Sequence, residues 1–340
     1  MHREGWCNLN SPLNIKKSVL LFMATAITLA FTTMACRDGD IAGDLQWRND
    51  ITKHHRYAPI EPATLHYLDI GQGEPVILIH GWADSVYTWH KNLPILVQAG
   101  FRIILMDLPG MGESDIPPHN FVYSIENLAQ TVINLADHLK LSRFTIAGHS
   151  MGGAIALYLC IYYPQKIKHA VAIAPACYRP SHRTGRFLLK IPGVKPLAGV
   201  LAGKWAVAFA LRQVYYNDAL VTDTMVNEYA RPFKKPGYVD TITSLALDFF
   251  SPTHVQMTQS YDHIVTPLLI IWGDNDLWLP PTMGRRLHKQ VNGAGLTIIP
   301  NAGHNVHQEA NTLVNNHIVE FLATAAKPST QGSAVGVNSP

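Results

Sequence analysis

The chain has 340 residues, of which 47% are hydrophobic and 15% charged. It can therefore bury a sizeable core, which excludes disorder for most of its length and fits one large α/β domain or two small ones. The formal net charge is only +3 and no dense run of Lys and Arg interleaved with aromatic residues occurs, so we expect no nucleic acid partner.

The first 36 residues differ from the rest of the chain. Lys16 and Lys17 precede an uncharged, apolar segment over residues 18–35, and Cys36 follows it. This layout is typical of an export signal, and the segment is also close to the minimum length of an uncleaved membrane anchor. Its ending, "TMAC", resembles a bacterial lipoprotein signal, in which Cys36 carries the lipid. We expect residues 1–36 to be a signal peptide or membrane anchor that leaves the rest of the chain outside the cytoplasm, at a bacterial cell envelope.

Strand-like and helix-like segments alternate after a polar stretch, residues 37–59, that predicts a tether. The uniformly apolar run 75–79 is typical of a strand that is buried on both faces of a parallel sheet. Helical spacing of Leu128, Val132, Leu135 and Leu139 predicts a helix over 124–141, with Ser124 as a capping residue. Further strands are expected near 63–70, 101–107, 143–148 and 168–176, and further helices at 85–100 and 152–163.

The alternation stops at about residue 179 and resumes at about residue 262. Between these points the pattern is largely helical, and beyond them strands at 266–273 and 295–303 alternate with helices at 282–291 and 305–326. This order predicts an α/β domain over residues 60–326, with a mostly parallel central sheet, helices on both faces and a mainly helical lid insertion over about 179–262. The small, polar residues 327–340 predict a disordered tail.

The segment Gly148-His-Ser-Met-Gly152 lies where a predicted strand turns into a predicted helix. The pattern G-x-S-x-G at such a turn is typical of a nucleophilic serine, because glycines two residues on either side allow a very tight turn. Ser150 is then held in a sparsely populated backbone conformation with its hydroxyl exposed, and the helix N-terminus faces any oxyanion formed there. A glycine-rich packing turn is the alternative.

A serine nucleophile needs a base, and the base needs a group that orients it. His304 follows a predicted strand late in the chain, and Asp274 and Asp276 follow the strand before it. The order Ser150, aspartate, His304 is that of one known catalytic arrangement.

With these pieces the chain resembles the α/β-hydrolases over residues 60–326. The motifs that carry the resemblance are "HGW" at 80–82, "DLPGMGES" at 107–114, "GHSMGG" at 148–153, "GDNDLWLP" at 273–280 and "GH" at 303–304. The resemblance implies Ser150 as nucleophile, His304 as base and then acid, and Asp276 rather than Asp274 as the orienting carboxylate. It also implies an oxyanion hole made by the backbone N–H groups of Trp82 and Met151, and a structural turn at Asp107.

Other residues in these motifs are assigned no chemistry. His149 is expected to pack beside the site, and the spacing of His304, His307 and Glu309 does not fit a zinc helix, so we expect no metal and no cofactor. Cys160 lies too far along its helix from the strand end that precedes Cys177, so both are expected to be free thiols.

The predicted function is that of a serine hydrolase that cleaves a carboxylic ester through an acyl-enzyme. Residues 179–212 contain seven Lys and Arg and no Asp or Glu among many apolar residues, which fits either contact with an anionic membrane and a lipophilic ester substrate or ordinary packing of a lid. Acyl transfer and C–C bond hydrolysis with the same three residues stay open, as does a ligand-binding protein without turnover. Haloalkane dehalogenases and epoxide hydrolases of this fold have a carboxylate at the elbow, where this chain has Ser150.

Overall fold

The computed structural model describes residues 51–179 and 203–325. Several predicted segments therefore lie outside the described residues: the signal or anchor over 1–36, most of the tether over 37–59, part of the lid and the tail over 327–340. Cys7 and Cys36 lie outside them as well. In the part of the chain that is described, no helix is both long and apolar enough to span a bilayer.

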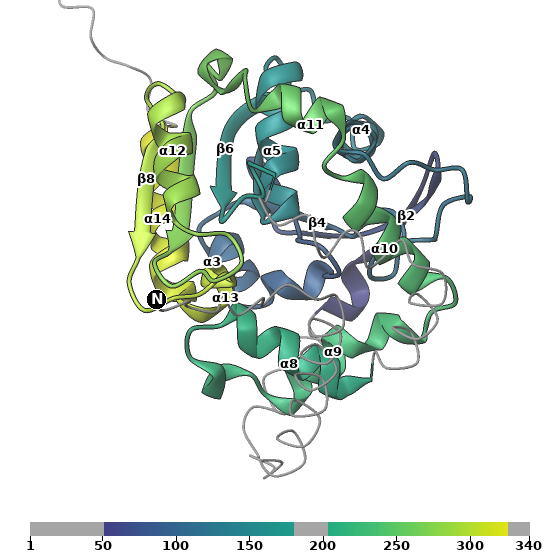
Figure 1. Ribbon diagram of the computed structural model, residues 1–340. Coiled ribbons are helices and arrows are strands. Elements are labelled where there is room, and N and C mark those ends of the chain that lie inside the picture. The colour runs from purple at the N-terminus through teal and green to yellow at the C-terminus, as the bar shows by residue number, and fades with distance from the viewer. Residues whose placement is uncertain (1–50, 180–202, 326–340) are drawn as a thin grey trace, which may run out of the picture. The chain divides into compact units, whose positions relative to one another are not determined.

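A single eight-stranded sheet forms the centre of the domain (Figure 1). Its strands follow one another in the order β1-β2-β4-β3-β5-β6-β7-β8. The β1–β2 and β2–β4 pairs are antiparallel and all the others are parallel, which confirms the predicted mostly parallel sheet. The strands are β1 (His55–Ile60), β2 (Ala63–Ile70), β3 (Pro75–Ile79), β4 (Arg102–Met106), β5 (Phe144–His149), β6 (Ile167–Ile173), β7 (Leu268–Gly273) and β8 (Gly295–Ile299).

Both faces of the sheet are buried, because successive strand residues point to opposite sides. In β3, Ile77 and Ile79 join the core that contains side chains of α4 (Ile125–His138), α5 (Met151–Tyr162) and α12 (Thr282–Gln290). Val76 and Leu78 join the opposite core, with side chains of α3 (Leu93–Gln98) and α14 (Asn311–Ala325). Burial on both sides explains why the sequence of β3 is uniformly apolar.

A helical insertion, residues 203–257, separates β6 from β7. It contains α8 (Lys204–Val214), α9 (Asp223–Ala230), α10 (Tyr238–Asp248) and α11 (Pro252–Met257), with the short turns η3 (Asp218–Leu220) and η4 (Arg231–Lys234). Figure 1 shows α8 and α9 beyond the carboxyl ends of the strands. The predicted helical interruption is thus present, whereas its action as a lid stays a prediction.

Two predicted boundaries differ from the structure. The range 37–59, predicted as a tether, contains η1 (Thr52–His54) and most of β1, which pairs with β2 along its whole length. As an edge strand with a proline and few buried residues, β1 has a weak sequence pattern. The single helix predicted over 85–100 is instead η2 (Val86–Trp89) followed by α3, because Pro94, in the first turn of α3, has no N–H with which to continue the preceding turn.

Candidate active site

The loops after β3 and β5 meet at the point where the strand order reverses. Within the sheet, β3 lies between β4 and β5. The chain passes from β3 to its neighbour β4 on one side and then crosses back to β5, the neighbour of β3 on the other side. Such a switch point is where open α/β sheets bind ligands, beyond the carboxyl ends of the strands. Ser150 follows β5, and a Cβ placed on Gly81, just after β3, would lie 3.3 Å from the Ser150 Cβ. The two loops therefore touch at the predicted nucleophile.

Ser150 sits on a strained turn between β5 and α5. Its backbone has φ 52° and ψ −111°. Residues other than glycine rarely adopt such a positive φ. A Cβ on Gly148 would lie 2.2 Å from the carbonyl carbon of Gly152, and a Cβ on Gly152 would lie 2.4 Å from the Ile79 oxygen. Glycine at both positions is therefore what allows this turn to present the hydroxyl at the strand end.

His304 and Asp276 form a buried pair. The His304 Nδ1 lies 2.7 Å from the Asp276 Oδ2, and both residues are less than 5% exposed. The other carboxylate oxygen of Asp276 accepts backbone N–H groups from Trp278 at 2.9 Å and Leu279 at 2.8 Å. Asp274, the other candidate, is exposed and contacts Asn275. Asp276 is thus the aspartate that the structure brings to the imidazole.

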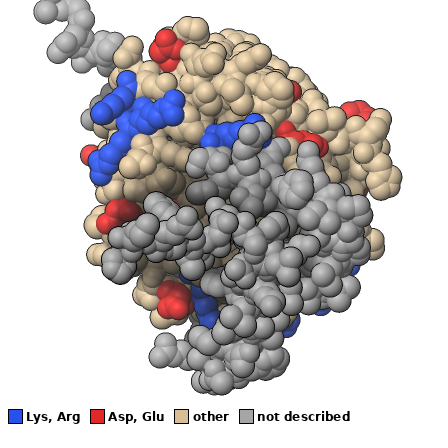
Figure 2. All heavy atoms as spheres, in the orientation of Figure 1, with Lys and Arg blue, Asp and Glu red and all other residues tan. Residues whose placement is uncertain are grey.

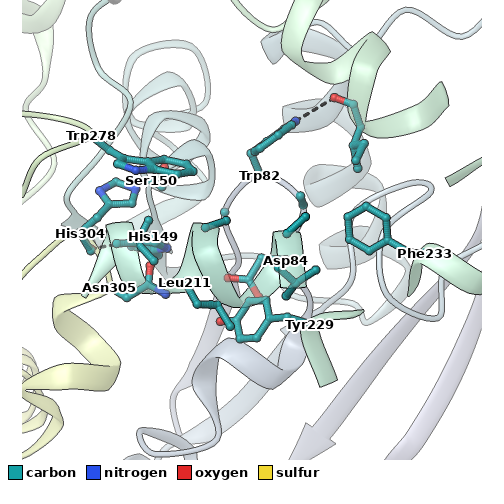
Figure 3. A pocket seen from close by; sticks show the side chains of 17 residues that line it. Trp82, Asp84, His149, Ser150, Leu211, Tyr229, Phe233, Trp278, His304 and Asn305 are labelled. Atoms are coloured by element: carbon teal, nitrogen blue, oxygen red, sulfur yellow. Dashed lines mark hydrogen bonds between the residues drawn. The ribbon is translucent and has the colours of Figure 1, made fainter. Parts of the chain in front are cut away.

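Ser150 and His304 line the same cavity. Figure 3 shows both toward one end of it, together with Trp278, whose ring stacks on the His304 imidazole at a centroid distance of 5.9 Å. Within residues 51–179 and 203–325, no hydrogen bond joins the Ser150 hydroxyl to His304. A catalytic hydrogen bond of this kind commonly forms or tightens only when substrate binds.

The two amides predicted for the oxyanion hole flank Ser150. Met151 is the first residue of α5, and Trp82 follows Gly81 in the loop after β3. Neither backbone N–H donates to an acceptor in the described part of the chain. The Trp82 side chain is held elsewhere, since its Nε1–H donates to the Ile242 carbonyl at 2.8 Å (Figure 3). Both amides are thus available to a ligand.

His80 fixes the loop that carries Trp82. Its Nε2 accepts the backbone N–H of Leu108 at 3.0 Å, so its Nδ1–H donates to the Gly81 carbonyl at 2.7 Å. Burial lowers the pKa of His80 more than the nearby Asp107 charge raises it, which keeps the imidazole neutral. In the sequence His80 is visible only as part of the "HGW" motif, and no pattern there predicts this positioning role.

The cavity has a volume of about 200 Å³ and is bounded by the two strand-end loops and the helical insertion. Most of the side chains that line it are apolar. No Lys or Arg is among the described residues in its wall; on the face shown in Figure 2, Lys and Arg gather instead over α12, where Arg285, Arg286 and Lys289 are exposed. The lining residues are Gly81, Trp82, Ala83, Asp84, His149, Ser150, Ala206, Val207, Ala210, Leu211, Val214, Tyr229, Phe233, Ile242, Trp278, His304 and Asn305.

Asp107 holds loops together and does not line the cavity. Its carboxylate lies 2.7 Å from His66 Nδ1. It also accepts hydrogen bonds from the backbone N–H groups of Val86 at 2.8 Å and Glu113 at 2.9 Å. Burial alone would raise the pKa of Asp107, but the His66 hydrogen bond and charge outweigh it and lower the pKa. The predicted structural role is confirmed by these contacts.

The other titratable residues near the motifs are held by packing or by hydrogen bonds, or are buried. His149 packs between His304 and His307, and its Nε2 lies 3.0 Å from the His304 carbonyl. Glu309 accepts three backbone N–H groups, one of them from Gly303 at 2.7 Å. Cys160 and Cys177 are buried and free, as predicted.

One polar residue in the cavity wall was assigned nothing from the sequence. Asp84 is 6% exposed, lines the cavity and follows Trp82 by two residues. Burial raises the pKa of its carboxyl to about 7, against smaller opposing effects of hydrogen bonds from Ser85, Thr88 and Tyr229. A lone aspartate in a loop gives no sequence pattern, so only the fold reveals this burial.

The fold and the site together define a class of protein. A serine on a strained strand-to-helix turn, above a mostly parallel sheet and beside a buried imidazole–carboxylate pair, is the arrangement of an α/β hydrolase. Comparison with known families agrees. The model described as "alpha/beta hydrolase fold" matches residues 74–197, and one described as "TAP-like protein" matches residues 250–334.

Proteins similar to this chain match it over most of its length. The uncharacterized hydrolase YugF of Bacillus subtilis is 28% identical over 76% of this chain and 92% of its own. Bifunctional epoxide hydrolase 2 of Sus scrofa is 25% identical over 80% of this chain, which spans only 56% of that longer protein. The meta-cleavage product hydrolase of Pseudomonas fluorescens superposes with a TM-score of 0.68 at 25% identity, over 79% of this chain and 98% of its own. The chain belongs to the α/β-hydrolase superfamily and is a hydrolase of that fold.

Proposed function

We propose that this chain is a serine hydrolase that cleaves a carboxylic ester through an acyl-enzyme on Ser150. The observation that carries the proposal is the 2.7 Å contact between His304 Nδ1 and Asp276 in the wall of the cavity that Ser150 also lines. A carboxylate on Nδ1 fixes the tautomer in which Nε2 is free to take a proton. It also stabilises the imidazolium that forms when the proton is taken.

The proposed reaction has two halves. Ser150 Oγ attacks the ester carbonyl while His304 Nε2 takes its proton, and the negative oxygen is bound by the N–H groups of Met151 and Trp82. His304 then gives the proton to the leaving alcohol, and the acyl group stays on Ser150. In the second half His304 activates water, which attacks the acyl-enzyme, and the proton returns to Ser150 as the acid leaves.

The cavity wall favours a lipophilic ester. Ala206, Val207, Ala210 and Leu211 of α8 line the cavity, and aromatic side chains, among them Phe233 and Trp278, contribute further apolar surface to its wall. Such a wall gains free energy by burying hydrocarbon, at about 25 cal/mol per Å² of apolar surface. A volume of about 200 Å³ limits the enclosed part of the substrate to a small or medium acyl group.

C–C bond hydrolysis is the second candidate. It is supported by the likeness to the meta-cleavage product hydrolase, which covers 98% of that protein's chain. The same serine, imidazole and oxyanion donors serve a substrate whose leaving group is a carbon acid instead of an alcohol. Epoxide hydrolysis, the third candidate, has less support than C–C bond hydrolysis. The chain resembles epoxide hydrolase 2, but its elbow residue is Ser150 and not a carboxylate.

The test begins with the intact-protein mass after exposure to a fluorophosphonate. The wild type should gain one adduct and Ser150→Ala none; an unmodified wild type would exclude every reaction that uses Ser150 as nucleophile.

Hydrolysis of esters with short and long acyl chains is then compared with cleavage of a vinylogous diketone, a C–C hydrolase substrate. Higher kcat/KM for the diketone than for every ester would favour the second candidate. An alcohol added during ester cleavage reveals acyl transfer by the appearance of a new ester.

The proposal extends to the place where the enzyme works. Residues 1–36 would export the chain or anchor it in a membrane, with Cys36 as the site of lipid attachment and a lipid ester in the membrane as the substrate. Cell fractionation of the wild type and Cys36→Ala, with mass analysis of the processed N-terminus, tests this. A chain that stays in the soluble cytoplasmic fraction with residues 1–36 intact would contradict it.

A further inference from the structure

Asp84 is a buried carboxylate in the catalytic cavity that the proposed mechanism does not use. Its loop position, two residues after Trp82, brings it into the wall of the cavity although it is only 6% exposed. In the view of Figure 3, Asp84 and Tyr229 lie between the end that holds Ser150 and the end that holds Phe233. Because all of these residues line one cavity, an acyl chain that fills the cavity from Ser150 lies against the wall that contains Asp84.

The carboxylate is held in place by a network of oriented donors. The Ser85 backbone N–H donates to Asp84 Oδ1 at 2.7 Å, and the neighbouring hydroxyls of Thr88 and Tyr229 lower the pKa of the Asp84 carboxyl in opposition to its burial. Gln308 Nε2 donates to the Tyr229 oxygen at 2.6 Å and to the Thr88 oxygen at 2.7 Å. Tyr229 O–H also donates to Thr88 Oγ1 at 3.3 Å, and Thr88 Oγ1 lies 2.8 Å from His307 Nε2, so the two hydroxyls belong to one buried hydrogen-bonded cluster beside Asp84.

The direction of the network is set at its far end. Tyr215 O–H donates to Gln308 Oε1 at 2.7 Å, which fixes which end of that amide faces the two hydroxyls. Tyr215 belongs to the helical insertion and Gln308 to α13 (Val306–Glu309), so separate elements hold the donors. Asp84 thus lies between this buried hydrogen-bonded cluster and the cavity that it lines, with the Ser85 N–H as the donor to its Oδ1.

No cation balances this carboxylate in the part of the chain that the structure describes. The cavity wall there has no Lys or Arg, and Asp84 takes part in no ion pair. Burying a carboxylate without full compensation costs free energy, so a donor supplied by a ligand would be bound well. An alkylammonium brings three donors and would leave some unpaired against an apolar wall, whereas a hydroxyl brings one.

We propose that Asp84 is a specificity-determining residue that accepts a hydrogen bond from a hydroxyl group on the acyl chain of the substrate. The enzyme then prefers esters of hydroxylated acids to esters of the unsubstituted acids of the same length. This inference rests on the proposed ester hydrolysis. The hydrogen bond is remote from the reacting carbonyl and is the same in ground and transition states, so it acts on KM more than on kcat.

The experiment compares matched nitrophenyl esters of one medium-length acyl chain, either unsubstituted or hydroxylated at successive carbon atoms. At pH 8.5, above the pKa of about 7 of the Asp84 carboxyl, the acceptor is charged, and we expect kcat/KM of the full-length wild type to be about tenfold or more higher for one of the hydroxylated esters. Asp84→Leu should reduce this ratio to about one or less. Asp84→Asn keeps an acceptor oxygen without the charge and should give an intermediate ratio, with the change mainly in KM.

Asp240→Asn is the control, because Asp240 is an exposed carboxylate on α10 and its loss should leave both substrates and their ratio unchanged. Fluorophosphonate adducts count the active sites in each preparation. If the wild type shows no preference for any hydroxylated ester, or if both Asp84 variants keep the preference, the inference is wrong although ester hydrolysis stands. If the wild type forms no adduct and cleaves no ester, the proposed function fails and the inference fails with it.

Discussion

Replacing Asp84 by asparagine should change how the stability of the protein depends on pH. Burial raises the pKa of this carboxyl from an ordinary value of 3.8 to about 7. The folded chain therefore holds a proton that the unfolded chain releases, and the carboxyl contributes its full stability below pH 3.8. That contribution is lost as the pH rises from about 4 to about 7. Asparagine has no titration and still offers an oxygen to the Ser85 N–H.

The size of the effect follows from the two pKa values. At about 1.4 kcal/mol for each pH unit, the difference corresponds to about 4 kcal/mol in total, of which about 3 kcal/mol falls between pH 5 and pH 8. Urea unfolding of the wild type and Asp84→Asn at these two pH values measures it. With an m value of about 3 kcal/mol per molar, the wild-type midpoint should fall by about 1 M more than that of the variant between pH 5 and pH 8. Parallel pH profiles for the two proteins would refute the buried, unbalanced carboxylate.

The remaining predictions concern the site and the elbow. Asp276→Asn should lower kcat for the best ester by about a thousandfold or more, while Asp274→Asn should change it less than about threefold; equal losses in steady-state assays would show that the orienting carboxylate is misassigned. Gly152→Ala should lower the free energy of unfolding by at least about 3 kcal/mol, because its Cβ would lie 2.4 Å from a backbone oxygen; an unchanged urea midpoint would contradict the tight turn. Burial lowers the pKa of His307 from 6.5 to about 3, so the stability it contributes is full above pH 6.5 and is lost as the pH falls toward 3. His307→Gln should therefore lose about 2 kcal/mol less than the wild type between pH 7 and pH 5, and an equal loss would show that His307 is protonated in the folded protein.

The parts of the fold that could be predicted are those whose place in the structure determines their own residue pattern. A strand with both faces buried must be apolar throughout, so β3 and β7 are visible as uniform runs in the sequence. The elbow is visible because its two glycines touch each other and the end of β3, and no other residue fits there. Since these features fix the order of the motifs on the sheet, Ser150, Asp276 and His304 could be proposed as one site before the structure was known.

The parts that could not be predicted depend on contacts between distant segments. Asp84 is buried in a cavity wall that also contains Tyr229 and Asn305, residues far from it in the sequence, and no local pattern connects these segments. The edge strand β1 is similar, because pairing with β2 stabilises it although its own sequence alternates weakly. In both cases the conformation of the segment is stabilised by contacts with residues far away in the sequence, so the segment's own residues do not reveal it.

The helical insertion is attached to both loops that carry the reacting groups. Trp82 Nε1–H donates to the Ile242 carbonyl of α10, and the backbone N–H of Asn305, next to His304, donates to the Val214 carbonyl at the end of α8 at 3.0 Å. A displacement of α10 therefore pulls on the loop with the predicted oxyanion donor, and a displacement of α8 pulls on the loop with the imidazole. Because a shift of about 1 Å in such groups costs about a hundredfold in rate, the insertion constrains the geometry of the site as well as the space above it.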